Sequence, residues 1–344
     1  MALDSYRLAP GVRMTGDRNT DLSALYSLPA GSIGAAVDQI AGTVNGDVMN
    51  AAVSLERMMA SAVDNHRRGI GKAAENEESA WSTGLGQWTA TGSDANAPGY
   101  RVSAGGIIGG MDALRTADSK VGVTGAFAQG NVKTDNAAVA TIQSERVGVY
   151  GGLLDGDWRF DSELALGADQ YKTRRTVALG SLVRSATGKS SGYGLSADGA
   201  VHYDGWSYVS PFAEMRDDLE HRASFTEQGV GGLSLAVADE TLNTPRSLLG
   251  VELHDEGGIV KTSLKLAWAH DFGQIAGQPI EALTGSPLVA FTARSSQLGA
   301  DAGVAHLAVS SEIASDLNAF IEYDGEMRTH STSQSVFAGL HFNW

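Results

Sequence analysis

The sequence predicts an all-β protein: a transmembrane, antiparallel, up-and-down β-barrel preceded by one α-helix. Two observations carry this prediction. From Ser79 to the C-terminus, apolar and polar residues alternate with a period of two, in runs of about ten residues or more bounded by polar turns. A membrane-spanning helix needs about 18–20 consecutive apolar residues, and the longest apolar runs here are far shorter. Membrane insertion would therefore be through strands.

Residues 1 to about 78 have a different pattern and precede the strands. We expect a loop up to about residue 27, a break at Leu28–Ser32, a short helix near residues 33–40 and a main helix over about 46–66. Small and apolar residues at spacings of three and four give this helix one apolar stripe. The stripe comprises Val48, Ala51, Ala52, Leu55, Met58, Met59, Ala62 and Val63. Arg67 and Arg68 follow, where cations favour a helix end.

About twelve strands are predicted in the remaining chain, an even number as single-chain barrels require. Their expected ranges are 79–91, 99–112, 117–130, 139–154, 157–172, 191–204, 206–221, 244–255, 259–272, 299–312, 316–328 and 334–344. The last strand is the clearest, because Val336, Ala338, Leu340, Phe342 and Trp344 alternate with a second set of residues. Residues 288–292 are interpreted as part of a long outer loop.

The lengths of the connections between strands predict which end of the barrel faces the periplasm and which faces the outside of the cell. Short links are expected around 155–157, 203–205, 255–258 and 315–316, and long polar links around 131–139, 173–190, 222–243 and 273–298. Such alternation is typical of a barrel with one end in the periplasm and the other outside the cell. Trp158, Trp206 and Trp344 lie beside short turns or the terminus, where the periplasmic membrane interface favours indole rings.

Charged residues on the strands are expected to point into the lumen, because a basic group facing lipid at mid-depth costs about 2–4 kcal/mol. By parity these are Arg146, Asp161, Glu163, Asp169, Asp198, Glu214, Arg216, Glu252, Lys265 and Glu322. They would hydrate the pore and hold the helix as a plug. The alternative is that they are solvated lumen residues with no specific partner.

Composition excludes several other classes of protein. A formal charge of -15 with scattered basic residues argues against nucleic-acid binding. The absence of cysteine excludes disulfides, a thiol nucleophile and a cysteine-ligated metal, and the 8 histidines have no helical spacing typical of metal ligands, so no metal or other cofactor is expected. The first residues lack the basic region and apolar stretch of a signal peptide, so an exported protein would be represented here by a fragment.

Residues 28–344 resemble the translocator domain of classical monomeric autotransporters, the type V secretion proteins of Gram-negative bacteria. The resemblance rests on the order of three segments: Leu28–Arg68, Asn318–Gly325 and the aromatic C-terminal strand. It implies residues 1–27 as a passenger remnant, 28–78 as a linker with a helix inside the barrel, and 79–344 as the translocator. About twelve strands enclose enough room for one helix.

The resemblance also implies the partners and the location of the protein. An integral domain of the bacterial outer membrane would contact lipid and lipopolysaccharide, carry its own N-terminal passenger to the cell surface and act as a monomer. The barrel-assembly machinery, served by periplasmic chaperones, would recognise Val336, Ala338, Leu340, Phe342 and Trp344 as an assembly signal. Such a domain is not itself an enzyme.

Two other functions are weighed against the translocator. A passive porin-like channel would have no use for a helix as long as the bilayer is thick. An outer-membrane hydrolase would need an acid, a base and a nucleophile that converge near the rim. Asp198 with His202, and Glu252 with His254, share a face, but at a two-residue spacing that ordinary lumen positions also give.

Overall fold

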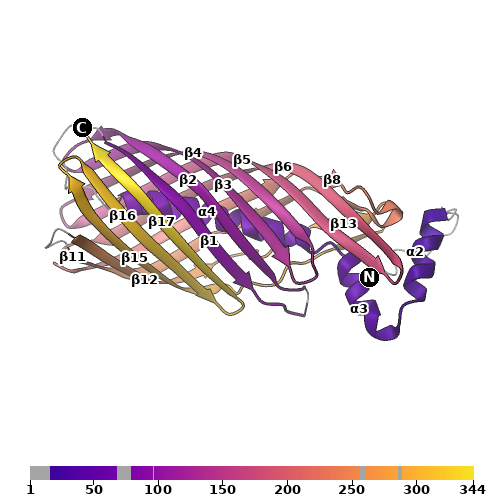
Figure 1. Ribbon diagram of the computed structural model, residues 1–344. Coiled ribbons are helices and arrows are strands. Elements are labelled where there is room, and N and C mark those ends of the chain that lie inside the picture. Colours follow the sequence, from indigo (N-terminus) through magenta and orange to yellow (C-terminus); the bar gives the residue numbers. More distant parts are fainter. Residues whose placement is uncertain (1–15, 68–78, 96, 256–259, 286–288) are drawn as a thin grey trace.

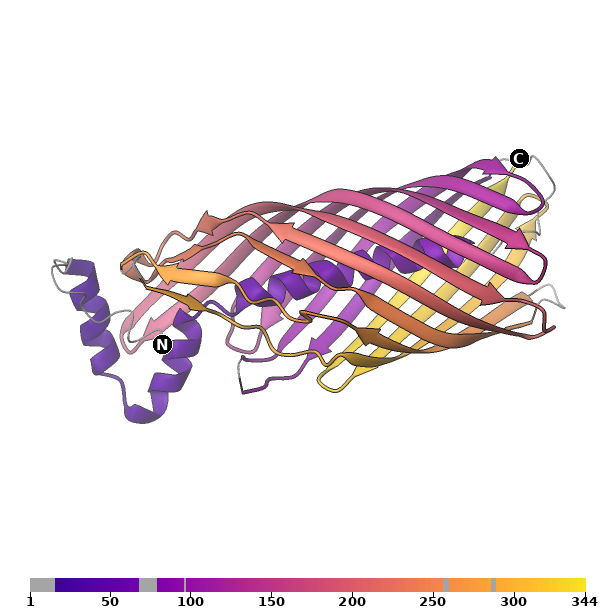
Figure 2. The same ribbon diagram turned by 180° about the vertical axis from the view of Figure 1, so that it is seen from behind.

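The computed structural model describes residues 16–67, 79–95, 97–255, 260–285 and 289–344. Twelve long antiparallel strands form a closed barrel, and a helix lies along its axis (Figures 1 and 2). Each long strand pairs with the next one along the chain. The first and last strands pair over thirteen residue positions, from Ser79 opposite Asn343 to Thr91 opposite Ser331, and this seam closes the cylinder. The predicted fold class is confirmed.

Ten of the twelve long strands agree with the predicted ranges to within about four residues, whereas the fifth and the sixth extend well beyond theirs. The twelve strands are β1 (Ser79–Thr91), β2 (Tyr100–Arg115), β3 (Ser119–Thr134), β4 (Val139–Asp155), β5 (Trp158–Leu179), β6 (Leu182–Tyr203), β7 (Val209–Arg222), β11 (Arg246–Asp255), β12 (Val260–Asp271), β15 (Asp301–Ala314), β16 (Leu317–Arg328) and β17 (Ser331–Asn343). The short β10 (Glu240–Asn243) pairs with the same neighbour as β11, namely β7. Pro245 lies between β10 and β11, where its missing N–H interrupts the ladder. The predicted short link at 255–258 lies, beyond its first residue, outside the described residues.

Two of the predicted long links are wrong. Residues 173–190 belong mostly to β5 and β6, which continue to a tight turn at Gly180 with a φ of +62°. Residues 131–139 are mostly strand, and only 135–138 separate β3 from β4. These stretches have polar residues on the outward face, such as Lys133, Arg174 and Lys189, so they lack an apolar band. A strand segment that extends beyond the hydrocarbon into water does not need an apolar outward face. The expected alternation of short and long links also fails at residues 329–330, where a short link joins β16 to β17 in place of a long one.

The other two long links contain a second, four-stranded sheet. It comprises β8 (Phe225–Thr226), β9 (Leu235–Val237), β13 (Ile280–Leu283) and β14 (Ala290–Thr292), in the order β14-β13-β9-β8, and a short 3-10 helix η2 (Gly231–Leu233) accompanies it. The interpretation of residues 288–292 as loop is therefore wrong for 290–292, while 286–288 lie outside the described residues. Strands of two to four residues are too short to show a period in the sequence.

Within residues 16–67, three helices and a 3-10 turn precede β1. They are α2 (Gly16–Tyr26), η1 (Ala30–Ser32), α3 (Ile33–Ile40) and α4 (Val44–Arg67). The loop predicted up to residue 27 is wrong for 16–26, where α2 forms, whereas the two later helices are confirmed. Among the described residues, no helix is both long and apolar enough to cross a bilayer.

The second sheet, the β5–β6 extension and helices α2 and α3 share a small apolar core at one end of the barrel, which we call the outer cap. Its buried residues are Leu25, Ala36, Ile40, Val177, Leu179, Ala186, Val230, Leu233, Leu235, Val237, Leu283 and Phe291. Figures 1 and 2 show α2 and α3 beyond the strands at this end, while the C-terminus lies at the opposite end. The cap therefore lies outside the cylinder that encloses α4.

The outward face of the barrel carries an apolar band. On β5 the exposed positions are Trp158, Phe160, Ser162, Leu164, Leu166 and Ala168, which are apolar apart from Ser162, and from Gln170 onward they are polar. A membrane strand needs about 9–11 residues to cross the hydrocarbon, which this interval satisfies. The side chains of Trp158, Trp206 and Trp344 are also exposed on the outside of the barrel. Outward-facing rings at the ends of the strands are what an aromatic girdle requires.

Candidate functional site: a helix inside the barrel

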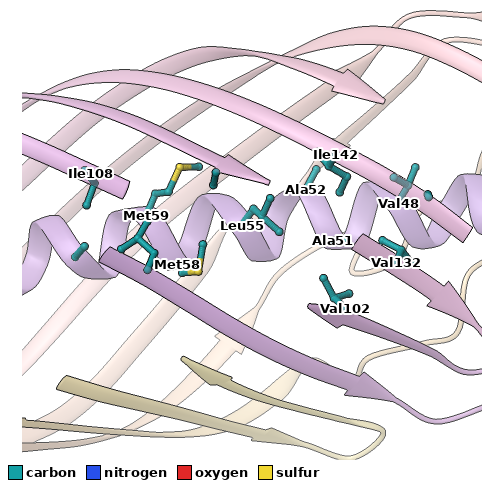
Figure 3. Packing of buried hydrophobic residues seen from close by; sticks show 14 of the residues in the cluster. Val48, Ala51, Ala52, Leu55, Met58, Met59, Val102, Ile108, Val132 and Ile142 are labelled. Atoms are coloured by element: carbon teal, nitrogen blue, oxygen red, sulfur yellow. The ribbon is translucent and has the colours of Figure 1, made fainter. Parts of the chain in front are cut away.

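Helix α4 fills much of the lumen, and its apolar stripe packs against one side of the wall. All eight predicted residues are buried: Val48, Ala51, Ala52, Leu55, Met58, Met59, Ala62 and Val63. Figure 3 shows this stripe facing Val102 of β2, Val132 of β3 and Ile142 of β4. On β3, Gly130 leaves room for Leu55, because a Cβ there would lie 3.0 Å from Leu55 Cδ1. Arg67 ends the helix, and Arg68 lies outside the described residues.

Helix α4 also carries charged residues beside the apolar stripe, and Glu56, near the middle of the helix, meets Arg146 of β4. The Arg146 Nε donates to Glu56, while its two terminal nitrogens each lie 3.1 Å from an Asp169 oxygen. Arg146 Nη2 also donates to Glu220 of β7 at 2.9 Å. Ser196 of β6 donates to Glu56 Oε1 at 2.6 Å. One guanidinium therefore holds a helix carboxylate against three strands, and every charged side chain in the group is at most 4% exposed.

Arg57 makes a second set of contacts one residue further along α4. Its Nε donates to Asp218 of β7 at 2.8 Å, and its Nη2 donates to Asp271 of β12 at 2.9 Å. Arg216 also donates to Asp218, at 2.6 Å. Glu56 and Arg57 thus connect the helix to strands on both sides of its polar face.

The last turn of α4 makes a third set of contacts. Arg67 donates to Asp198 of β6 at 2.9 Å, and Asp64 accepts from Lys265 of β12 at 3.2 Å. Glu214 accepts from the same Lys265 at 3.3 Å, and Asn65 donates to Glu322 of β16. We call the three sets together the lumen clamp.

All ten charged strand residues singled out from the sequence lie on the inward face, with Glu214 partly buried and the other nine buried. The lumen clamp brings seven of them to α4 or to a residue that holds it: Arg146, Asp169, Asp198, Glu214, Arg216, Lys265 and Glu322. Asp161 and Glu252 instead lie 3.5 Å from Arg159 nitrogens. Glu163 is 7% exposed near the end of α4.

Sequence reasoning missed the helix residues Glu56 and Arg57 and the strand residues Asp218, Glu220 and Asp271. A signal for two of the strand residues was present, because Glu214, Arg216, Asp218, Glu220 and Arg222 are successive inward positions of β7. The parity that placed Glu214 and Arg216 inward therefore extends to the end of that strand. On the helix, Glu56 and Arg57 lie beside the apolar stripe. Their role cannot be inferred from the sequence pattern without knowledge of their partners on the strands.

The link between β12 and β15 covers the other end of α4. Asn50 accepts from the Gly277 N–H at 2.7 Å and donates to Ser295 at 2.8 Å, and Ser295 donates to Asp47 at 2.6 Å. Gly46 and Gly277 approach so closely that a Cβ on Gly277 would lie 2.4 Å from the Gly46 carbonyl oxygen. These contacts pack the first turns of α4 tightly against this link.

Comparison with known proteins identifies the family of this helix-filled barrel. The family model of the autotransporter β-domain matches residues 80–324. The chain belongs to the autotransporter β-domain family. The barrel is thus an outer-membrane translocator.

Individual autotransporters agree with this assignment. An extracellular serine protease of Serratia marcescens is 23% identical over 330 residues, which are 89% of this chain and 30% of that protein. The translocator domain of the autotransporter NalP from Neisseria meningitidis superposes with a TM-score of 0.68 at 15% identity, over 88% of this chain and all of that one. The β-domain of the Bordetella autotransporter BrkA gives a TM-score of 0.54 at 14% identity, over 78% and 100%. The chain spans under a third of its curated relative.

The residues weighed for a hydrolase make contacts with other lumen residues of this autotransporter β-domain. Asp198 accepts from Arg67 of the helix. His202 lies with its Nε2 3.6 Å from Asp161 and its Nδ1 4.0 Å from Glu252, which are not its pattern partners. His254 is partly buried and lines the cavity at the end opposite the outer cap.

Within the outer cap, Glu281 of β13 is a buried carboxyl group outside the barrel strands. Burial raises its pKa well above the usual range, although Asn45 donates to it at 2.8 Å and Arg175 and Arg222 favour its ionised form. Glu227 nearby favours the protonated form. Because the folded pKa is raised, the contribution of Glu281 to stability is largest below the unfolded pKa of about 4.3 and declines as pH rises.

We therefore expect the cap of the autotransporter domain to loosen as pH rises from about 4.5 to neutral, and Glu281→Gln to weaken that dependence. The neutral amide keeps a polar partner for Asn45 without a buried charge. Susceptibility of residues 273–298 to a protease active at both pH values would measure this. A pH dependence that is equal in Glu281→Gln and the parent would contradict it.

Proposed function

We propose that this domain displays an N-terminal passenger at the cell surface and keeps α4 as a plug in the lumen afterwards. The observation that carries the proposal is the lumen clamp, which joins one helix to β4, β6, β7, β12 and β16 around the barrel. A helix held from so many strands blocks the pore. The helix also connects the two ends of the barrel, as the last segment of a translocated chain must.

The direction of display follows from the two ends of the barrel. Helix α4 begins beside the outer cap and ends near the short turns and the C-terminus. In outer-membrane barrels the short turns face the periplasm and the longer connections face outside. The cap would then lie at the surface, and the passenger would leave from α2. Residues 1–27 as passenger remnant, 28–78 as linker and 79–344 as translocator remain our proposed division, with the remnant partly docked through Leu25.

The outward face of β17 supports a role in assembly. Val336, Leu340, Phe342 and Trp344 are 36% to 51% exposed, and Ala338 is also exposed, so all five predicted signal residues point away from the lumen. A barrel-assembly partner could read them before the β1–β17 seam closes. We also propose that the domain is monomeric, contacts lipid and lipopolysaccharide with its apolar band, and is delivered by periplasmic chaperones.

Single-channel conductance in planar bilayers tests the plug. We expect the refolded chain to show a small, flickering conductance and a version without residues 1–70 to show a large, steady one, because the clamp and the apolar stripe both leave with the helix. Heat-dependent mobility on a denaturing gel would verify that the shortened barrel is folded. Equal conductance of two folded proteins would refute the plug and favour a porin-like channel.

A further inference from the structure

Three potential metal ligands meet near the end of α4 that faces away from the outer cap. They are His66 of the last helical turn, Asp112 of β2 and His341 of β17, and their ligand atoms all lie within 4.8 Å of one another. His66 Nε2 is 3.1 Å from Asp112 Oδ1, and the two imidazole centroids are 5.1 Å apart. Because the ligands come from three separate elements, the sequence alone predicted no metal site.

His341 has an unused ligand atom in this cluster. Its Nε2 is buried and has no hydrogen-bond partner among the residues that the structure describes. A cavity of about 490 Å³, lined by both His66 and His341, opens beside the cluster. An ion can therefore reach the cluster through a polar space.

The other two ligands are already oriented by neighbours, as metal ligands usually are. Tyr150 donates to Asp112 Oδ1 at 2.6 Å, and Ser79 donates to Asp112 Oδ2. The His66 ring stacks on Trp81 with centroids 4.7 Å apart and an interplanar angle of 18°. Neighbours therefore hold His66 and Asp112 in place, while the Nε2 of His341, unpaired within the described part of the chain, can turn toward them.

The chemistry of the ligands selects the class of ion. Two imidazoles and one carboxylate suit Zn²⁺ and similar divalent transition metals, rather than Ca²⁺ or Mg²⁺, which prefer oxygen. Metal–ligand distances of about 2.0–2.2 Å in a tetrahedral arrangement place neighbouring ligand atoms about 3.3 Å apart. The His66–Asp112 separation is near that value, and water can take the fourth position.

Two cations beside the cluster oppose metal binding and limit its affinity. Lys120 Nζ lies 3.5 Å from His66 Nε2 and donates to the His66 carbonyl oxygen at 3.0 Å. Arg115 lies 3.4 Å from Asp112 Oδ2. A divalent ion must displace or tolerate the ammonium group of Lys120, so this residue should tune the affinity of the site.

We propose that His66, Asp112 and His341 bind one Zn²⁺-class ion that fastens the end of the lumen helix to β2 and β17. The bound ion connects the helix to two strands that the lumen clamp does not use. It thus holds the last turn of α4 from the side opposite Asp198 and Lys265. The site does not require that a passenger be present.

Equilibrium dialysis of the refolded chain against ZnCl₂, followed by elemental analysis, tests the site. We expect one saturable Zn²⁺ per chain, with His66→Gln and His341→Gln each weakening binding by roughly tenfold or more. His254→Gln is the matched control, because His254 lines the same cavity outside the cluster. Absence of saturable binding, unchanged binding in His341→Gln, or an equal loss in His254→Gln would overturn the proposal.

Two further measurements locate the ion without relying on loss of binding. Bound Cu²⁺ should show two imidazole nitrogens by electron paramagnetic resonance in the parent and one in His341→Gln. Lys120→Met should tighten Zn²⁺ binding by about tenfold, since it removes a positive charge beside His66. Unchanged or weaker binding in Lys120→Met would contradict the location, with heat-dependent gel mobility verifying that each variant is folded.

Discussion

Replacing Arg146 with leucine should destabilise the barrel by about 3–5 kcal/mol, the usual cost of breaking a buried ion pair from one side. Arg146 is the shared partner of Glu56, Asp169 and Glu220. Without the guanidinium, three nearly inaccessible carboxyl groups face one another inside the lumen. The measurement is urea unfolding of the folded domain at fixed detergent concentration, followed by tryptophan fluorescence.

The matched control is Arg101→Leu. Arg101 lies 3.4 Å from Asp135 in an ion pair whose side chains are 73% and 52% exposed. An ion pair in water contributes little, so we expect this variant to change the free energy of unfolding by less than about 1 kcal/mol. Adding Glu56→Gln to Arg146→Leu should restore part of the stability by removing one of the stranded charges. Equal effects of Arg146→Leu and Arg101→Leu would show that the lumen clamp is hydrated and contributes little.

Gly277→Ala should separate the β12–β15 link from the start of α4. The new Cβ would meet three backbone atoms of Gly46, the carbonyl oxygen at 2.4 Å, Cα at 2.8 Å and the carbonyl carbon at 2.9 Å, and backbone cannot rotate away as a side chain can. Overpacking of this kind costs about 1–3 kcal/mol, and more where the backbone must shift. We expect faster proteolysis of residues 273–298 and a larger conductance, because the contact that closes the lumen beside the cap is lost.

Gly303→Ala on β15 is the comparison for that variant, since no atom lies within 4 Å of the position of its Cβ. It should leave the proteolysis rate and the conductance of the parent unchanged. A Gly277→Ala protein as resistant to proteases as Gly303→Ala would show that the link adjusts freely and does not seal the lumen.

The barrel itself was predictable because the hydrocarbon imposes a simple alternation on every strand. Parity placed Arg146 and Lys265 inward without any knowledge of their neighbours. Their partners could not be predicted in the same way, because contact with Glu56 or Asp64 depends on the rotation and depth of α4 in the lumen. That geometry is set by packing of Leu55 and its neighbours against the wall.

The outer cap was predicted least well, for a related reason. Outside the membrane a strand does not need apolar residues on its outward face. The β5–β6 extension therefore has polar residues there, and its sequence was interpreted as loop. The cap core forms between residues distant in the chain, such as Leu25, Val177 and Leu283. His66, Asp112 and His341 share this property, since nothing in their spacing indicates that α4 brings them together.

The outer cap also determines how the domain would respond to a pull on the polypeptide that we propose it displays. Tension entering through α2 would first load the apolar core around Leu25 and the Asp21–Arg184 ion pair, whose atoms are 3.4 Å apart. That core is continuous with the β5–β6 hairpin, and therefore with the barrel wall. Drag from fluid flow or from an attached surface would thus be carried as shear along two long strands anchored in the membrane. The helix in the lumen would bear load only after the cap had yielded.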